Sequence, residues 1–306
     1  MTVISRIFSR RGYGGLRAAK ILRSAVRTST STTVSGPTEE SPSAKVPQKS
    51  AGEKKAIPDR YRFMYPELLP DPNPKFRNAM REKLERMDML ARRTHVLIPE
   101  FYIGSILSVT YSEPHAPGKV NKFVGICIQR GDCGLRAWFI LRNVVDGQGV
   151  EVKYEMYDPT IQKIECLKLE KRLDPHLRYL RDAPLEYSTF SFDMEPEYLA
   201  EGTAVPVNKT RVKLNLMPWI EKWERQELRG IIIDPRVRFT ENRLRKGKVA
   251  ATPWVKYDLM KTYRETIPEE DQNEIFSEVY TQLRDLEIAN RRQKHKRPFI
   301  RPKKTG

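Results

Sequence analysis

Few side chains in this 306-residue sequence could support catalysis or bind a metal, and they are scattered along it. None of the histidines or cysteines has the short spacing at which metal ligands recur. They are His95, His115, His176 and His295, with Cys127, Cys133 and Cys166. Catalysis requires titratable groups that converge on one point. The sequence therefore predicts no enzyme, no metal site and no cofactor.

Two other motifs also favour structural roles. The Gly131-Asp132-Cys133-Gly134 turn lacks the Lys-Ser/Thr pair of a phosphate-binding loop. The acidic run Glu269 to Asp271 stands where a helix dipole favours anions, so it indicates a helix start in preference to a metal site. With three cysteines and no CxxC pair, the chain fits a reducing compartment.

Basic side chains are the clearest functional signal. The chain has 56 Lys and Arg against 39 Asp and Glu, a formal net charge of +17, which predicts binding to a polyanion. The charge is uneven, because residues 98–186 hold 12 basic and 12 acidic residues whereas residues 291–306 hold eight basic and none acidic. RNA is the favoured partner, and an anionic membrane surface is the alternative.

Three groups of cations are candidate RNA contacts. Turns and strands of the central region carry Lys119, Lys122, Arg130, Arg136 and Arg142. A second group is Arg236, Arg238, Arg243, Arg245 and Lys246, near Phe239 and Trp254. Basic residues among aromatic ones suit unpaired RNA, although a surface loop with one buried Trp explains this pattern equally well. The third group is the tail with Arg291, Arg292, Lys294, Lys296, Arg297, Arg301, Lys303 and Lys304.

The N-terminal region predicts targeting. Residues 1–38 contain no Asp or Glu and carry recurrent arginines among Ser, Thr and small apolar residues, which is typical of a mitochondrial transit peptide. A basic nucleic-acid-binding arm is the alternative. Residues 39–57 are polar, rich in Ser, Pro and Lys, and are expected to be a disordered linker.

Residues 58–97 are expected to form a Pro-rich lead-in followed by an amphipathic helix that begins just after Pro74 and runs to about Arg93. Its predicted packing face consists of Phe76, Met80, Leu84, Met87 and Ala91. The arginines on the other face are expected to be solvated or to face RNA.

Residues 98–186 change to a β pattern, with five short runs rich in β-branched and aromatic residues separated by turn signals. An open sheet of this size could not bury two faces, so closure into a small β-barrel is expected. Residues 187–290 form an extension with helices expected at Pro218–Arg229 and Pro268–Arg292, and residues 291–306 form the basic tail. No apolar run is long enough to span a membrane. The expected fold class is α+β, with an N-terminal helix, a barrel and a mainly helical C-terminal extension.

An ordered string of residues in the central region resembles the bacterial-type ribosomal protein L19 family. It comprises Ile98-Pro99-Glu100-Phe101, Gly104, Gly125, Arg130-Gly131, Arg142, Gly147, Gly149-Val150-Glu151, Asp158-Pro159, Ile161, Lys163-Ile164 and Leu177 to Arg181. The resemblance covers about a third of the chain and implies an SH3-like β-barrel. It also implies a place in the large ribosomal subunit against ribosomal RNA, near the small-subunit interface.

Together with the targeting segment, the resemblance implies a structural protein of the mitochondrial ribosome that supports translation in the matrix. The expected partners are large-subunit ribosomal RNA, neighbouring mitochondrial ribosomal proteins and small-subunit RNA at the interface, without stable membrane insertion. Two alternatives stay open. One is a mitochondrial RNA-processing or modifying enzyme that uses the barrel as its RNA-binding module, and the other is a peripheral inner-membrane protein held by its basic ends.

Overall fold

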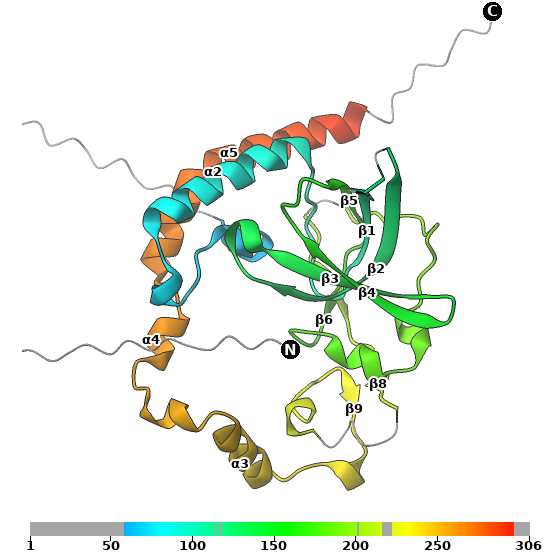
Figure 1. The fold of residues 1–306 in the computed structure, drawn as a ribbon, viewed down its shortest axis with the longest axis vertical. Coiled ribbons are helices and arrows are strands. Elements are labelled where there is room, and N and C mark those ends of the chain that lie inside the picture. The colour runs from blue at the N-terminus through cyan, green and yellow to red at the C-terminus, as the bar shows by residue number, and fades with distance from the viewer. Residues whose placement is uncertain (1–57, 114, 117, 201, 216–221, 297–306) are drawn as a thin grey trace, which may run out of the picture. The chain divides into compact units, whose positions relative to one another are not determined.

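A five-stranded antiparallel sheet lies at the centre of the fold in the computed structural model, which describes residues 58–113, 115–116, 118–200, 202–215 and 222–296 (Figure 1). The predicted transit peptide, the linker and the tail residues Arg297, Arg301, Lys303 and Lys304 lie outside the described residues. The strands are β1 (Ile106–Ser112), β2 (Val120–Gly131), β3 (Trp138–Val145), β4 (Gln148–Glu155) and β5 (Ile161–Lys168). They lie in the order β4-β3-β2-β1-β5.

The hairpin between β3 and β4 shows how the sequence fixes this register. Asp146 and Gly147 have φ angles of 50° and 77°, the left-handed conformation that a two-residue hairpin turn requires. As a result Val145 pairs with Gln148, and Arg142 lies directly opposite Glu151. The predicted turn and strands are confirmed here.

The predicted closure into a barrel is not seen, because no ladder joins the edge strands β4 and β5 in the described part of the chain. Both faces of the sheet are buried without closure. On one face, Leu107, Val109 and Leu141 belong to a core that includes residues of two long helices. On the other, Ile126 and Ile128 pack against residues of the segment 177–183, which follows the sheet, and against Val212, Leu214 and Ile231 of the extension. The prediction did not allow for this second layer.

The two long helices are α2 (Ala79–His95) and α5 (Glu269–Lys296), which lie side by side (Figure 1). The α5 helix confirms the predicted one, with its acidic first turn and its buried Ile275, Val279 and Leu283. The α2 helix begins later than predicted, at a capping box. The side chain of Asn78 accepts a hydrogen bond from the Arg81 amide, and Glu82 accepts one from the Asn78 amide.

The predicted packing face of α2 is wrong. Phe76, Met80, Leu84 and Met87 are more than half exposed. The helix instead buries Glu82, Met89, Leu90 and Arg93. Two of these are charged, and they are accommodated because the protein supplies partners for them. Periodicity of apolar residues alone therefore selected the wrong side of the helix.

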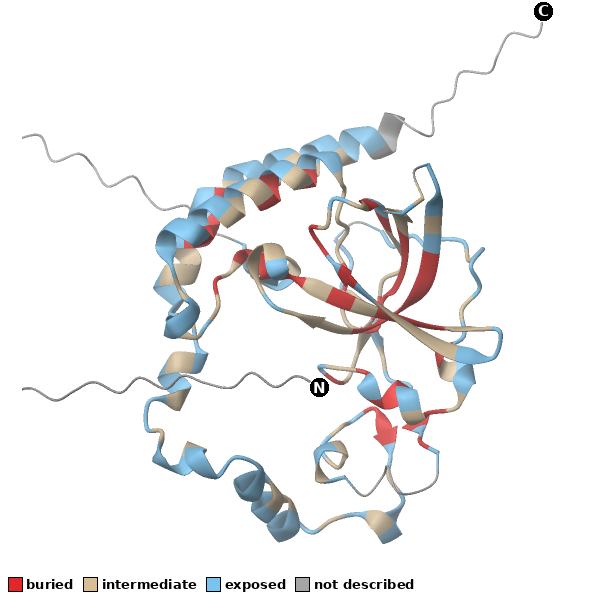
Figure 2. Cartoon of the chain, viewed as in Figure 1, coloured by how far each residue is buried: buried red, intermediate tan, exposed pale blue. Residues whose placement is uncertain are grey.

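The remaining elements are short. They are α1 (Asp59–Met64), α3 (Glu241–Ala251), α4 (Lys261–Glu265) and the parallel pairs β6 (Lys171–Arg172) with β7 (Val207–Asn208) and β8 (Val212–Lys213) with β9 (Ile231–Ile232). Where a helix over Pro218–Arg229 was predicted, residues 216–221 are not described and Trp223–Arg225 form a 3-10 turn. Figure 2 shows buried residues along the sheet and none on α3. None of the described helices is long and apolar enough to span a membrane.

Candidate nucleic-acid interface

Three of the five cations predicted in the central region are exposed. Lys119 and Lys122 lie in the hairpin between β1 and β2, and Arg136 lies in the 3-10 turn before β3. The Nζ of Lys122 donates to the backbone oxygen of Phe192 at 3.0 Å, which holds the ammonium group against the segment that follows the sheet. These side chains can reach a phosphate outside the protein.

Arg142 has a structural role that the sequence analysis did not anticipate. It is buried, with only 6% of its surface exposed. Its Nε donates to Ser188 at 3.2 Å and its Nη1 to Glu151 at 2.8 Å. Because the guanidinium group binds partners inside the protein, we leave Arg142 out of the proposed RNA contacts.

Arg130 is also engaged within the protein. Its Nη1 donates to the backbone oxygen of Phe101 at 2.6 Å, and its Nη2 lies 3.4 Å from Glu67. The guanidinium carbon lies 4.1 Å from the centre of the Phe101 ring. This arginine ties β2 to the segment that leads into the sheet, so we leave it out as well.

Arg130 is connected through Glu67 to a buried polar network. Glu67 also pairs with Arg93, and both of these side chains are almost fully buried. The Nε of Arg93 donates to the hydroxyl of Tyr157 at 3.0 Å, and its guanidinium lies over the Tyr65 ring at 4.5 Å. Burial raises the pKa of the Tyr157 hydroxyl, so this group stays protonated. The network joins α2 to the sheet and contains no solvent-facing group that could perform chemistry.

Glu151 connects the buried Arg142 of β3 to Arg181, which lies in the 3-10 helix Arg178–Asp182. Its carboxylate accepts from Arg142 and, through two bonds of 2.9 and 2.7 Å, from Arg181. Partial burial would raise the pKa of this carboxyl, but the bonds and positive charges of Arg181 and Arg142 outweigh it and lower the pKa. Glu151 is therefore a firmly ionised acceptor that holds Arg142 in place.

The second predicted group is exposed throughout. Arg236, Arg238, Arg243, Arg245 and Lys246 all lie at the surface, the last three on α3. The guanidinium of Arg243 lies over the Phe239 ring at 4.2 Å. The α3 helix is held at Gly247, where a side chain would come within 3.2 Å of the Trp223 ring, and by an ion pair of 2.5 Å between Lys248 and Glu227. These contacts leave the other side of α3 open.

Of the predicted tail, Arg291 and Arg292 are exposed on α5. Lys294 and Lys296 continue the same helix. The described part of the predicted tail is therefore helical.

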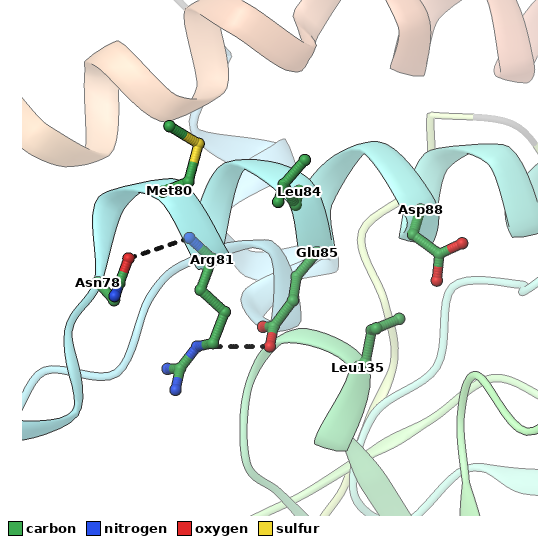
Figure 3. A pocket seen from close by; sticks show the side chains of 7 residues that line it. All are labelled: Asn78, Met80, Arg81, Leu84, Glu85, Asp88 and Leu135. Carbon is green, nitrogen blue, oxygen red and sulfur yellow. Dashed lines mark hydrogen bonds and ion pairs between the residues drawn. The ribbon is translucent and has the colours of Figure 1, made fainter.

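An open pocket of about 520 Å³ lies beside α2 (Figure 3). Its lining residues are Asn78, Met80, Arg81, Leu84, Glu85, Asp88 and Leu135. Arg81 and Glu85 pair across one turn of the helix at 3.5 Å, which neutralises both charges. The pocket has the apolar Leu84 and Leu135 but no convergent set of catalytic groups.

The thiols are also unsuited to chemistry. Burial raises the pKa of Cys127 and of Cys166 to about 12, so neither thiol ionises near neutral pH. Among the described residues, no group of three or more His, Cys, Asp or Glu side chains is placed to hold a metal ion.

Comparison with known proteins identifies the relatives of this chain. Residues 82–188 match the family model described as Ribosomal protein L19. The chain is 58% identical to the large ribosomal subunit protein bL19m of Drosophila melanogaster over 257 residues, 84% of each protein. It is 33% identical to the bL19 protein of Ehrlichia ruminantium strain Welgevonden over 84 residues, 27% of this chain and 67% of that protein. It is 29% identical to the bL19c protein of Spinacia oleracea over 93 residues, 30% of this chain and 40% of that protein.

The match to the fly protein covers 257 residues, which is more than the whole of this chain up to residue 188. It therefore includes part of the C-terminal extension. The predicted resemblance is confirmed, and the extension is a feature shared with that relative.

Proposed function

The chain belongs to the ribosomal protein L19 family, and from this premise we propose that it is a structural constituent of the large subunit of the mitochondrial ribosome. The observation that carries the proposal is the 58% identity to the bL19m protein over 84% of both chains. The relatives are ribosomal proteins, which agrees with the expectation of a protein that is not an enzyme. The RNA-processing alternative has no support from them.

In this proposal the protein binds large-subunit ribosomal RNA and thereby supports mitochondrial translation. Its RNA contacts are the exposed Lys119, Lys122 and Arg136, the five cations from Arg236 to Lys246, and the basic tail that begins at Arg291. Lysines and arginines that neutralise phosphates release counterions, which gives affinity that decreases with salt. Neighbouring ribosomal proteins and small-subunit RNA at the subunit interface are further proposed partners.

Two finer statements belong to the same proposal. The five-stranded sheet is the counterpart of the family's SH3-like barrel, opened at β4 and β5 and covered by the extension. Residues 1–38 are the transit peptide that directs the chain to the mitochondrial matrix, and residues 39–57 link it to the folded part.

Co-sedimentation tests this function. The mature protein should sediment with large mitochondrial ribosomal subunits in the presence of detergent, and high salt should release it because phosphate contacts are screened. Recovery only among free matrix proteins would contradict the proposal. Release by detergent at low salt would indicate attachment to a membrane instead.

A further inference from the structure

A basic island lies in the otherwise acidic C-terminal extension. Residues 235–264 contain nine Lys and Arg and only two acidic residues. The stretch that follows, residues 265–290, contains eight acidic residues and one arginine. Residues 182–208 contain six acidic residues and no Lys or Arg. Residues 209–234 hold six Lys and Arg against four acidic residues, so the largest excess of positive charge in this part of the chain lies in residues 235–264.

The same island exposes three large aromatic rings. Trp254 is 65% exposed, Tyr257 is 79% exposed and Tyr263 is 68% exposed. The exposure of Trp254 rules out the alternative of a loop around one buried tryptophan. Trp254 and Tyr257 lie in the 3-10 turn Pro253–Tyr257, and Tyr263 lies in α4. Rings of this size are ordinarily buried or bound to a partner.

Contacts within the island give these residues a defined arrangement. Arg264 pairs with Asp258, which links α4 to the end of the preceding 3-10 turn. The Nζ of Lys256 lies 5.3 Å from the centre of the Tyr257 ring. A cation therefore stands beside the exposed Tyr257 ring, and Arg243 likewise lies over the partly buried Phe239 ring.

The packing of α3 adds cations that point away from the protein. Its Gly247 side rests on Trp223, and at 100° per residue Arg245 lies on nearly the opposite side of the helix. Arg245 and Lys246 are both exposed. The island thus combines cations that can bind phosphates with rings that can stack on bases.

We infer that residues 235–264 form a binding surface for unpaired RNA, in which Trp254, Tyr257 and Tyr263 stack on bases and the cations of α3 bind the adjacent phosphates. The inference rests on the proposed function and specifies the kind of RNA that this surface takes. Bases in a duplex are stacked on one another, whereas unpaired bases offer their faces to aromatic side chains. The excess of positive charge in residues 235–264 favours RNA as the partner over an uncharged groove on another protein. Leu259 and Met260, the apolar residues that such a groove would bind, are exposed here as well.

Binding of the full chain to two probes tests this inference. The probes are a single-stranded oligouridylate and an RNA duplex of the same length. Replacing Trp254, Tyr257 or Tyr263 by Ala should lower the affinity for the single strand by roughly five- to 150-fold, the range for one stacked base. Affinity for the duplex should not change. Tyr257→Phe should keep native affinity because the ring remains.

Two further variants complete the design. Tyr198 is 90% exposed but lies in the stretch without Lys or Arg, so Tyr198→Ala is the matched control and should bind both probes like the native chain. Replacing Arg245 and Lys246 by Gln should weaken binding to both probes and flatten its salt dependence.

The outcomes are distinguishable. Ring variants with native affinity for the single strand, or an equal loss on both probes, would overturn the inference. Ring variants that bind RNA normally but are missing from large subunits would assign the rings to a protein partner and also overturn it. If the native chain sediments with large subunits in any of these cases, the proposed function stands. If the native chain fails to sediment with them, the proposed function itself fails.

Discussion

The buried pair of Glu67 and Arg93 connects a residue of the lead-in segment to the α2 helix. Both side chains are at least 95% buried. Removing one member of a buried pair leaves the other charge without compensation. We expect Glu67→Ala to lower the free energy of unfolding by about 3–5 kcal/mol, measured by denaturant unfolding.

The pair of Arg81 and Glu85, whose side chains are 45% and 21% exposed, is the control for that measurement. It joins two residues one turn apart on α2, where water screens the attraction. Glu85→Ala should change the free energy of unfolding by about 0.5 kcal/mol or less. Similar losses for the two variants would mean that the Glu67 pair is solvated and that the network is not a structural core.

Glu151 gives the stability of the protein a defined pH dependence. Because its pKa is lower in the folded protein than in the unfolded chain, its contribution is complete at neutral pH and is lost as the pH falls below the ordinary value near 4.5. Glu151→Gln should therefore reduce stability at neutral pH and lessen the further loss on acidification. Denaturant unfolding from neutral to acidic pH would measure this, with Glu186→Gln, at an exposed glutamate, as the control. Parallel stability curves for the native chain and Glu151→Gln would contradict it.

At the level of single residues, the sequence identifies cations but not their partners. The Asp146-Gly147 turn could have placed Arg142 opposite Glu151, because a two-residue hairpin fixes the pairing of the strands. No such local signal exists for Arg130, which meets Glu67 from 63 residues away. Exposed and internally paired arginines look alike in a sequence, so the predicted site included both.

Among the elements, α2 offers a direct test of which side is packed. Leu84 and Leu90 lie six positions apart on the same helix, one 58% exposed and the other 5% exposed. Leu90→Ala should cost about 2–5 kcal/mol of unfolding free energy because it opens a cavity in the core. Leu84→Ala should remain within about 0.5 kcal/mol.

The same two substitutions decide between the packing face of α2 seen in the structure and the face predicted from the periodicity of apolar residues. A larger loss at Leu84 would restore the predicted packing face, with Met80 and Met87 in the core. Denaturant midpoints measured under one set of conditions suffice, because the substitutions are chemically identical and helix propensity changes equally at both positions.

Strands and long helices were predictable because their signals are local. The acidic first turn and the apolar spacing of α5 located it within a few residues of its actual start. The face of α2 was not predictable, because burial of Glu82 and Arg93 depends on partners elsewhere in the chain. Closure of the sheet failed as a prediction for the same reason, since residues of α2 and α5 complete the core on the face to which all five strands contribute.

For the whole molecule, the distribution of charge determines how binding should respond to salt. The region around the sheet is balanced, with 12 basic and 12 acidic residues in 98–186, and two of the three arginines predicted there as RNA contacts bind internal partners. The last 16 residues carry eight basic residues and no acid, and they continue from the end of a long helix. Long-range attraction to RNA is therefore expected to come mainly from the tail.

Removal of residues 291–306 tests this distribution. Each phosphate neutralised contributes about 0.7–0.9 to the slope of log affinity against log salt, so loss of the tail should flatten the slope more than loss of a few cations near the sheet. The comparison is a variant in which Lys119, Lys122 and Arg136 are replaced by Gln, measured by titration of ribosomal RNA at several salt concentrations. Equal slopes for the two variants would mean that the tail contributes no more phosphate contacts than Lys119, Lys122 and Arg136 do, which would contradict the expected distribution.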